Sequence, residues 1–556
     1  MALAVRCLDC GNVAPYHPTS VSCPRCNSQW RAAEYDYDTL APTFPELISK
    51  RPFDMWRYHE LLPVAASTPS LSLGEGGTPL LRAVNLGMML GAPLLFIKDE
   101  RQGPTGSFKD RQAALTIAAL KEAGITEMVA ASTGNVAISY SAYAARAGVK
   151  LWAFVTSLVP EVKMREIALY GSQVVKVTGS YDQAKQVASE FARRRHLFQD
   201  LGARTITSVE AMKTIAFEIA EQLGEALGGE FQQVADRPTW RAPDWYVQAI
   251  SGGMGPLGLA KGFRELKRMG IVSRIPSLAL IQADGCAPMV TSFHQGLETA
   301  VAVETPRTRI ETLATGDPGR AYTLLRQQVL ETGGAFASVT DDEAFRAMHI
   351  LAKMEGLSAE PAAAVGFAGL FKLVRAGVIK PGESIVVNCT GHTIPAEESL
   401  FGPHWRRDVE FPAAGLDTPE EGLLAALNRV APARFPRVAI VDDNADARQL
   451  IRRILQAQGN YTILEADSGM AGYELSRREL PDLVILDLMM PGMDGFQVLD
   501  ALKANNATAH IPVIVATAKE LTADEKTRLG TQIQALMQKG DFLNDEFVEE
   551  VKSLLK

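Results

Sequence analysis

The stretch "GPTGSFKDRQAA", residues 103–114, places a lysine at the start of a helix, directly after a turn rich in glycine. Such a turn presents backbone N–H groups and the positive end of the helix dipole to an anion. Lys109 could be an ordinary solvated lysine, because lysines are common at helix ends, or a group poised to meet a carbonyl. The rest of the sequence decides between these two interpretations.

Strand-like and helix-like segments alternate around this stretch, from about residue 63 to residue 400. Apolar runs such as "PLLFIKDE", "EMVAAST", "DWYVQAISG" and "SIVVNCTG" are separated by segments with helical periodicity, such as "AISYSAYAARAG". This alternation predicts parallel strands joined by crossover helices, in one α/β domain or a pair of them.

Three further turns follow strands in the same region. "ASTGNVAIS" offers the side-chain amide of Asn135, and "VVNCTGH" ends a strand on the neutral hydroxyl of Thr390. The segment "ISGGMGPLGLAKGF" has three glycines among four residues after a strand, a pattern that can bind a phosphate through backbone donors. Each of these patterns alone is weak evidence for a functional site. The order in which they occur along the chain is stronger evidence.

Taken in order, these segments resemble the threonine synthase branch of the fold-type II pyridoxal-phosphate enzymes. The resemblance covers about residues 1 to 400 and includes "PTGSFKDR" and "SAEPAAAVGFAGL", the latter with Glu360 and Pro361. It implies a two-lobed, tryptophan synthase β-like domain over residues 39–401 and pyridoxal 5′-phosphate as cofactor. The implied roles are a Schiff base on Lys109, a bond from Asn135 to the phenolic oxygen, phosphate binding by Gly252, Gly253, Met254 and Gly255, and Thr390 facing the pyridine nitrogen. A lysine in this role must be partly desolvated to stay nucleophilic and to move protons.

The resemblance implies a carbon–oxygen lyase that converts O-phosphohomoserine and water to threonine and phosphate, in a homodimer. Two alternatives stay open, namely β-replacement on O-phosphoserine as in cysteate synthase, and a non-catalytic amino-acid sensor in a phosphorelay. The chain departs from the family at Gly103 and Gln112, where asparagine and glycine are usual. The family's substrate-phosphate segment reads "GARTITSVEAMKT" at residues 202–214. The residues that match it or could substitute in it are Arg204, Ser208, Glu210, Lys213 and Thr214.

A short module with four cysteines precedes this domain, over residues 1–38. The two CxxC pairs, separated by twelve residues, suit a tetrahedral Zn²⁺ site made by Cys7, Cys10, Cys23 and Cys26. Two disulfides or four buried thiols are the alternatives, and a cytoplasmic setting disfavours disulfides. Four thiolates leave no open coordination position, so the expected zinc is structural.

The alternation of strands and helices restarts after a proline-flanked segment, residues 402–434, which reads as a linker with one short helix. In residues 435–556, Asp442, Asp443 and Asp487 each follow an expected strand, and another strand ends on Thr517. Carboxylates that meet at the C-terminal edge of a parallel sheet can hold Mg²⁺, and one of them can accept a phosphoryl group.

The order and spacing of these residues resemble a response-regulator receiver domain, with a flavodoxin-like (βα)5 fold. The resemblance implies that Asp487 is the phosphoacceptor, that Thr517 and Lys539 form the switch, and that a histidine kinase or phosphotransfer protein is the partner. The implied Mg²⁺ ligands are Asp442, Asp443, Asp487 and the carbonyl of Met489. Leu536 and Gly540 replace an aromatic residue and a proline that are usual near the lysine.

The composition is that of a globular protein, with 47% apolar residues in a chain of 556 and a net charge of −8. The acidic balance gives no electrostatic case for nucleic acid or an anionic membrane as a partner. No apolar run reaches the ~20 residues that cross a bilayer. We therefore expect a cytoplasmic protein with an α/β multidomain architecture, whose substrate is a small phosphorylated amino acid.

Overall fold

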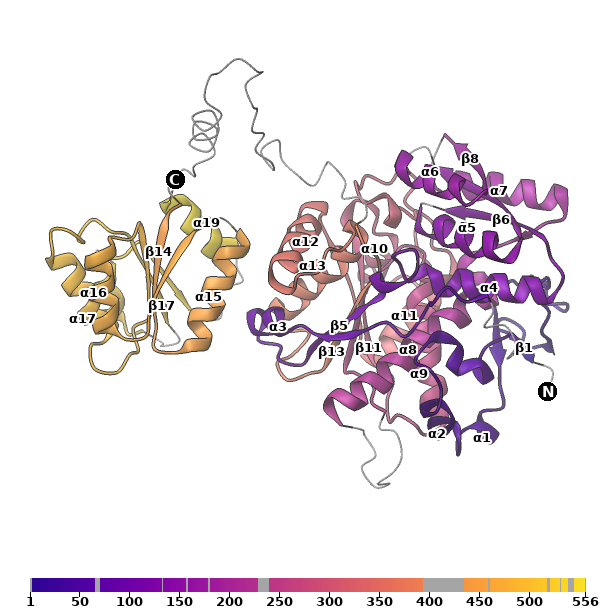
Figure 1. Cartoon of the computed structure of the whole chain (residues 1–556), viewed down its shortest axis with the longest axis horizontal. Helices are drawn as coiled ribbons and strands as arrows, with labels where there is room; N and C mark the ends of the chain where they lie inside the picture. Colours follow the sequence, from indigo (N-terminus) through magenta and orange to yellow (C-terminus); the bar gives the residue numbers. More distant parts are fainter. Residues whose placement is uncertain are drawn as a thin grey trace, which may run out of the picture. The chain divides into compact units, whose positions relative to one another are not determined.

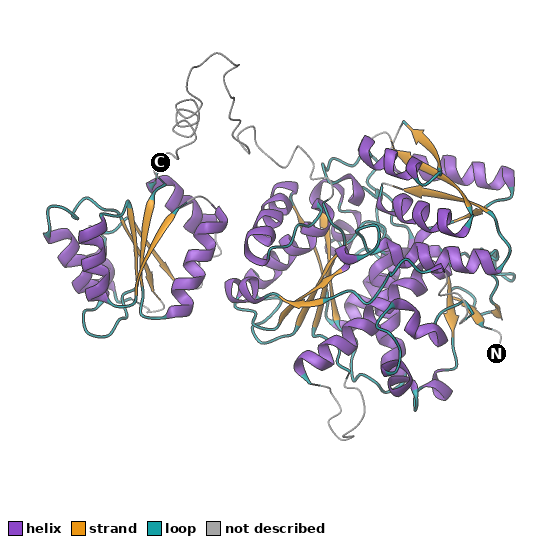
Figure 2. Cartoon of the chain, viewed as in Figure 1, coloured by secondary structure: helices purple, strands orange, loops and turns teal. Residues whose placement is uncertain are grey.

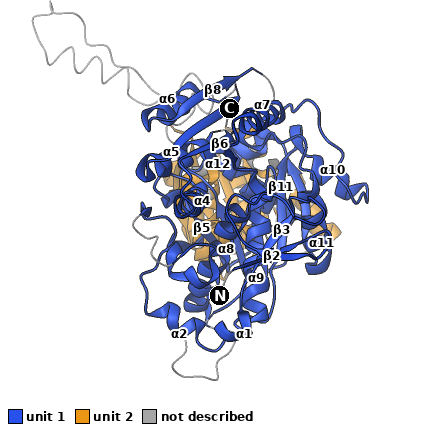
Figure 3. Cartoon of the chain, turned by 90° about the vertical axis from the view of Figure 1, so that its right-hand side faces the viewer, with its two compact units in different colours: residues 1–83, 92–348, 358–395 blue, residues 84–91, 349–357, 396–556 orange. Residues whose placement is uncertain are grey.

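The computed structural model describes residues 3–65, 71–132, 134–156, 159–178, 181–228, 240–393, 435–458, 461–517, 521–530, 532–538 and 545–555. The expected linker at residues 402–434, its helix, Lys539 and Gly540 lie outside the described residues. The chain divides into two compact units (Figure 3). The first comprises residues 1–83, 92–348 and 358–395, and the second comprises residues 84–91, 349–357 and 396–556.

The first unit begins with a three-stranded antiparallel sheet in the order β2-β1-β3. Cys7 ends β1, and the other three cysteines lie in the loops that connect the strands. The sheet and these loops, residues 3–38, are here named the cysteine module. The strands are β1 Ala4–Cys7, β2 Val13–Pro15 and β3 Arg31–Glu34. Two short helices and a 3-10 helix lead out of the module, and they are α1 Tyr37–Leu40, α2 Phe44–Ser49 and η1 Met55–Leu61.

A six-stranded sheet forms the centre of the first unit, in the order β12-β11-β10-β13-β5-β4, with β4 alone antiparallel to its neighbour. Every residue of β13 is buried, as expected for a parallel strand covered on both faces. Figure 2 shows helices on both faces of this sheet. Its strands are β4 Leu80–Arg82, β5 Leu95–Asp99, β10 Trp245–Ala249, β11 Ser277–Ala283, β12 Ala335–Val339 and β13 Ile385–Cys389. The helices in this part of the chain are α4 Lys109–Glu122, α8 Ile206–Leu227, α9 Met254–Arg268, α10 Pro288–His294, α11 Arg320–Thr332, α12 Asp341–Glu355 and α13 Pro361–Arg375.

A second, four-stranded parallel sheet in the order β8-β7-β6-β9 belongs to the same unit. Its strands are β6 Glu127–Ser132, β7 Lys150–Thr156, β8 Gln173–Val177 and β9 Phe198–Gln199, and the helices between them are α5 Asn135–Ala147, α6 Glu161–Leu169 and α7 Tyr181–Arg195. The first unit therefore carries two parallel sheets, and the loops after their strands can meet at one site.

The second unit contains a five-stranded parallel sheet in the order β15-β14-β16-β17-β18. Helices α16 and α17 cover one face of this sheet, and α15 and α19 cover the other (Figure 1). The order reverses between β14 and β16, which is where flavodoxin-like sheets place their sites. The elements are β14 Arg437–Val441, α15 Ala445–Gln458, β15 Thr462–Ala466, α16 Gly469–Glu479, β16 Leu483–Leu486, α17 Gly495–Ala504, β17 Val513–Thr517, α18 Ala523–Leu529, β18 Ala535–Gln538 and α19 Asp545–Leu554, and the unit also includes α3 Val84–Leu90.

Among the described residues, no helix combines the length and the apolar character that crossing a bilayer requires.

Candidate active site

Loops from both sheets of the first unit line a cavity of about 740 Å³. Strands β5, β13 and β10 are neighbours in the six-stranded sheet, and the segments that follow them bring in the lysine, the threonine and the glycine loop. Asn135 comes from the other sheet, at the start of α5 after β6. The cavity is lined by every residue that the sequence assigns to the cofactor, namely Lys109, Asn135, Gly252, Gly253, Met254, Gly255 and Thr390.

Lys109 is the first residue of α4 and is half-buried. Its ammonium nitrogen lies 4.2 Å from the centre of the Phe108 ring. Burial lowers the pKa of Lys109 to about 8, although the negative charges of Asp200 and Glu360 oppose this shift. The neutral amine, which is the form that attacks a carbonyl, is therefore much more accessible near neutral pH than in an ordinary lysine.

Glycine is favoured at two positions where the loop after β10 meets α9, namely Gly253 at the end of the loop and Gly255 in the first turn of the helix. Gly253 has a φ of +80°, and a Cβ there would lie 2.6 Å from Leu325 Cδ1. A Cβ at Gly255 would lie 2.6 Å from Gln248 Nε2 and 3.2 Å from the Phe108 ring. The loop thus exposes backbone to the cavity at the N-terminus of α9, an arrangement that favours an anionic group. These residues fit the phosphate of the expected cofactor.

Asn135 is held between a carboxylate and an ammonium group. Its amide nitrogen donates to both carboxylate oxygens of Glu360, at 2.9 and 2.8 Å, and its amide oxygen accepts from Lys163 Nζ at 3.2 Å. Lys163 Nζ lies 4.0 Å from the Glu360 carboxylate. The two charged partners fix the orientation of the amide, with its N–H groups directed to the acid. Sequence reasoning named Glu360 without a role and missed Lys163, which no motif marks.

The four cysteines of the module converge, and none of them forms a disulfide. Their sulfur atoms all lie within 4.8 Å of one another, with 3.5 Å between Cys7 and Cys26 and 3.6 Å between Cys10 and Cys23. Four convergent thiols fit a single tetrahedral metal ion.

Three carboxylates also converge in the second unit, where Asp442 follows β14 and Asp487 follows the neighbouring β16. Oxygen atoms of Asp442, Asp443 and Asp487 lie within 4.8 Å of one another. Thr517 ends β17, the next strand of the sheet, and is buried. The backbone N–H of Met489 donates to Asp487 Oδ1 at 3.3 Å. The sheet edge therefore gathers the residue types that the sequence assigned to a phosphorylation site.

Comparison with known proteins agrees with both sites. Residues 71–391 match the family model described as pyridoxal-phosphate dependent enzyme. The chain belongs to this family. Residues 438–551 match the model described as response regulator receiver domain. The predicted α/β multidomain fold, with a fold-type II pyridoxal-phosphate domain and a receiver domain, is confirmed.

Similar proteins include threonine synthases from two organisms. The enzyme of Methanocaldococcus jannaschii is 34% identical over 393 residues, which are 70% of this chain and 91% of that protein. The enzyme of Methanosarcina acetivorans is 31% identical over 398 residues, 71% of this chain and 93% of that protein. The chain is thus a threonine-synthase-like pyridoxal-phosphate enzyme joined to a receiver domain, which implies a phosphorylation partner such as a histidine kinase.

Solved structures with a similar fold include the processed form of threonine deaminase isoform 2 from Solanum lycopersicum, with a TM-score of 0.46 and 21% identity, over 56% of this chain and 78% of that one. Diaminopropionate ammonia lyase from Escherichia coli has a TM-score of 0.48 and 16% identity, over 58% of this chain and 86% of that one.

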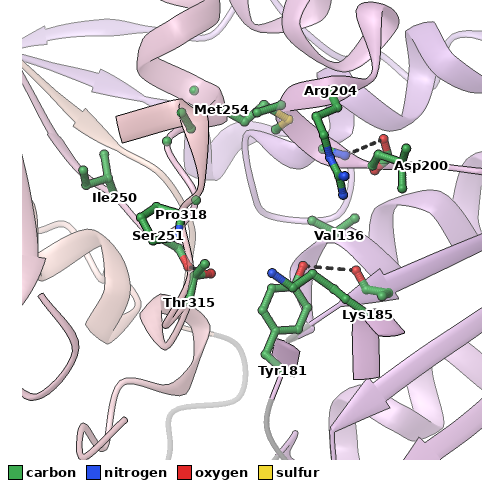
Figure 4. Close-up of a pocket in the computed structure, with 18 of the residues that line it drawn as sticks. Val136, Tyr181, Lys185, Asp200, Arg204, Ile250, Ser251, Met254, Thr315 and Pro318 are labelled. Atoms are coloured by element: carbon green, nitrogen blue, oxygen red, sulfur yellow. Dashed lines mark hydrogen bonds between the residues drawn. The ribbon is translucent and has the colours of Figure 1, made fainter. Parts of the chain in front are cut away.

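Two departures from the usual pyridoxal-phosphate motif have structural partners in this chain. A Cβ at Gly103 would lie 2.4 Å from Asp110 Oδ2 and 2.9 Å from the Ser107 carbonyl oxygen, so a larger residue would require this turn to shift. Gln112 Nε2 donates to Asp200 Oδ2 at 2.6 Å, and both residues line the cavity. Asp200, which sequence reasoning missed, also accepts from Ser208 Oγ at 2.9 Å. The cavity therefore carries the fixed carboxylate of Asp200 (Figure 4), whose negative charge acts on Lys109.

The segment at residues 202–214 divides between the cavity and the core. Lys213 is fully buried and pairs with Glu210 at 2.5 Å and with Glu265 at 3.0 Å. Thr214 is also buried and accepts from Arg111 at 3.0 Å. Neither Lys213 nor Thr214 lines the cavity, whereas Arg204 does. Lys213 and Thr214, which are identical to the family's substrate-phosphate segment, are therefore core residues. Arg204 is the residue of the segment that places a positive charge at the cavity.

Proposed function

We propose that the first unit uses pyridoxal phosphate to convert O-phosphohomoserine and water to threonine and phosphate. The observation that carries the proposal is the cavity, which brings together Lys109, Asn135, the glycine loop and Thr390. The sequence supports it, because 70% of this chain aligns with a threonine synthase. Arg204 supports a phosphorylated substrate, because it lines the cavity and no described carboxylate lies within ion-pair distance of it.

Each lining residue has a role that follows from its chemistry. When bound, pyridoxal phosphate supplies an electron sink for the carbanion that forms next to the amino group. Lys109 would hold the cofactor and would then move protons as a neutral amine of lowered pKa. The segment from Gly252 to Gly255 would hold the cofactor phosphate, and Asn135, whose amide Glu360 and Lys163 hold in place, would contribute its amide to the phenolic oxygen. Thr390 would offer its hydroxyl to the pyridine nitrogen, and a neutral partner at that nitrogen would favour replacement and elimination over transamination.

The deciding experiment is a phosphate-release assay on the purified full chain with O-phospho-L-homoserine and O-phospho-L-serine. We expect phosphate and threonine from the first substrate and slow or no release from the second. Release from O-phosphoserine alone would replace the proposal with the β-replacement alternative. A change in the absorbance of the bound cofactor without any phosphate release would favour the amino-acid sensor.

We also propose one structural zinc ion per chain, held by the four thiolates of the cysteine module. Replacing Cys23 with serine should remove most of the zinc, because a three-thiolate shell binds the ion far less tightly. Metal analysis of the purified variant measures this directly. The matched control is Cys286→Ser, a buried cysteine outside the cluster, which should keep the parent's zinc content. Equal zinc in Cys23→Ser and the parent would contradict the proposal.

In the second unit we propose that Asp487 accepts the phosphoryl group, with Mg²⁺ held by Asp442, Asp443, Asp487 and the Met489 carbonyl. The charge of roughly −1.5 to −2 that phosphorylation adds would draw Thr517 and Lys539 toward it. The receiver is covalently joined to one candidate effector, so we propose that it regulates the pyridoxal-phosphate domain.

The homodimer and the cytoplasmic location stay predictions from the resemblance and the composition.

Beryllofluoride, which mimics the phosphoryl group, should change the rate of phosphate release or the assembly state of the full chain. Coupling between sites typically amounts to ~1–3 kcal/mol, or about 5- to 150-fold. We expect the smaller end of this range, because Leu536 replaces the usual aromatic residue and is 40% exposed. Activity and sedimentation are measured with and without the mimic, in the parent and in Asp487→Ala. Identical values in all four samples would mean that the receiver serves a separate partner.

A further inference from the structure

The cysteine module contacts the lining of the active-site cavity at three places. Trp30 lines the cavity directly. Gln29 Oε1 accepts a hydrogen bond from Nη1 of Arg204, a lining residue, at 2.7 Å. Arg320, which begins α11 and also lines the cavity, forms an ion pair with Asp9 and donates to the carbonyl of Leu8. The module is therefore in contact with the part of the enzyme where the substrate must bind.

Trp30 and Arg204 form a partition on this side of the cavity. Both residues line the main cavity, and both also line a second, more open hollow of about 610 Å³ whose other walls belong mostly to the module. Figure 4 shows the Arg204 side chain extending into the space between the cavity walls, near Asp200. The position of this guanidinium thus depends on module residues behind it.

Arg204 differs from the other arginine and lysine side chains that line the cavity. Lys185 pairs with Asp182, Arg193 with Glu190, and Arg320 with Asp9. Lys109 is assigned to the cofactor. Within the part of the chain that the structure describes, the hydrogen-bond acceptor for the Arg204 guanidinium is the neutral carboxamide of Gln29. A neutral acceptor orients the guanidinium without forming an ion pair with it. The carboxylates of Asp200 and Asp317 act on it only at longer range, so its remaining donors stay open to an anionic ligand.

We propose that the cysteine module completes the substrate site, with Gln29 as a positioning residue that holds Arg204 ready to bind the phosphate of the substrate. The inference rests on the proposed function for the identity of the anion. An arginine with one nitrogen fixed still has Nη2 and Nε to bind phosphate oxygens, and its planar fork suits that geometry. The Trp30 side chain closes the wall beside this group.

The structure of the module explains how it keeps Gln29 in place. Gln29 and Trp30 follow Cys26 closely in the sequence, and Leu8 lies between Cys7 and Cys10. The N–H of Leu8 donates to the carbonyl of Trp30 at 2.9 Å, so the two cysteine turns are joined at this point. The four thiols therefore organise the same backbone that presents Gln29 to Arg204.

Calorimetric binding of inorganic phosphate to the cofactor-loaded full chain tests the proposal. The informative variant is Gln29→Glu, which keeps the size and the acceptor oxygen but places a negative charge against Arg204. We expect phosphate affinity to fall by at least about tenfold, or ~1.4 kcal/mol, while the absorbance of the bound cofactor stays unchanged. Gln29→Ala should weaken binding about tenfold, and Arg204→Gln by more. Arg6→Gln, in an exposed ion pair of the module, should bind phosphate as the parent does.

Unchanged phosphate affinity in Gln29→Glu would overturn the proposal, because a purely structural glutamine would tolerate or even gain from the new ion pair. A parent chain that binds no phosphate would overturn it as well. Failure of the proposed reaction is a separate result, since it would appear as the absence of phosphate release from both phosphorylated amino acids. Even then, weaker phosphate binding by the Gln29 and Arg204 variants than by the parent and Arg6→Gln would show that the module completes an anion site.

Discussion

Replacing Lys109 with alanine should abolish covalent attachment of the cofactor and lower turnover by at least about 1,000-fold, because one side chain supplies both the amine that holds the cofactor and the acid and base of the reaction. Visible absorbance of the purified protein, mass analysis after borohydride reduction and the phosphate-release assay measure these effects. Lys121→Ala is the matched control, because Lys121 lies in the last turn of the same helix, does not line the cavity and donates to the Ala147 carbonyl. Fixation of cofactor by borohydride in Lys109→Ala would identify another lysine as the anchor.

The lowered pKa of Lys109 predicts how the rate of cofactor capture depends on pH. The ammonium form cannot attack the cofactor aldehyde, so below the pKa the rate of cofactor capture by cofactor-free protein should fall about tenfold per pH unit. The pKa of Lys109 lies at about 8, and the rate should therefore rise with pH and level off above that value. A rate that still increases steeply between pH 9 and pH 10 would indicate an ordinary, solvated lysine.

The sequence could predict the cofactor residues because each of them sits beside a local signal. Lys109, Asn135, the glycine loop and Thr390 all follow strand patterns, and parallel strands bring their C-terminal ends to a common edge. The glycines also have a local cause, since the backbone at Gly253 requires a positive φ. The same reasoning predicted that the receiver acids converge, because they follow strands that pair in the sheet.

The substrate side of the site could not be predicted in this way, since it depends on contacts between distant segments. Gln29 meets Arg204, and Lys163 meets Asn135 and Glu360, across separations that no periodicity encodes. Asp200 carries no motif, and its carboxylate is held in the site by bonds from Gln112, Ser208 and the N–H of Gly202. Such groups are fixed by tertiary packing, which a single sequence does not specify.

Sequence matching also suggested a role for Lys213 that burial does not support. The letters "KT" at positions 213 and 214 agree with the family's substrate segment, but in α8 both side chains lie in the core. There Lys213 balances the carboxylates of Glu210 and Glu265 and lies 4.0 Å from the centre of the Tyr35 ring. A residue on a helix acts in the cavity or in the core according to the face it occupies, and identity alone does not reveal that face.

Replacing Arg111 with methionine should destabilise the pyridoxal-phosphate domain by about 3–5 kcal/mol, because it leaves buried carboxylates without their main partner. Arg111 is 1% exposed and donates from Nε and Nη2 to Glu100, at 2.8 Å each, and from Nη1 and Nη2 to Glu218, at 2.6 and 2.8 Å. Lys98, itself fully buried, donates to Glu218 at 2.7 Å and, among the residues that the structure describes, would be the one remaining cation of this cluster. The change in stability is measured by thermal unfolding, with the absorbance of the bound cofactor as the signal. The matched control is Arg165→Met, which breaks an exposed pair with Glu161 and should cost less than about 1 kcal/mol.

The difference in the free energy of unfolding between the parent and the Arg111→Met variant should become smaller as the pH falls. Burial acts to raise the pKa of Glu218, but the charges of Arg111 and Lys98 outweigh it and hold this pKa well below the ordinary value. A depressed pKa in the folded state contributes stability above the unfolded pKa, and this contribution is lost as the pH falls toward the folded value. Without Arg111 the carboxylate should regain a higher pKa and accept a proton more readily, which relieves the unpaired charge. The parent should therefore lose more stability than the variant between pH 7 and pH 4.5, and parallel stability curves would show that Arg111 contributes through packing rather than through its charge.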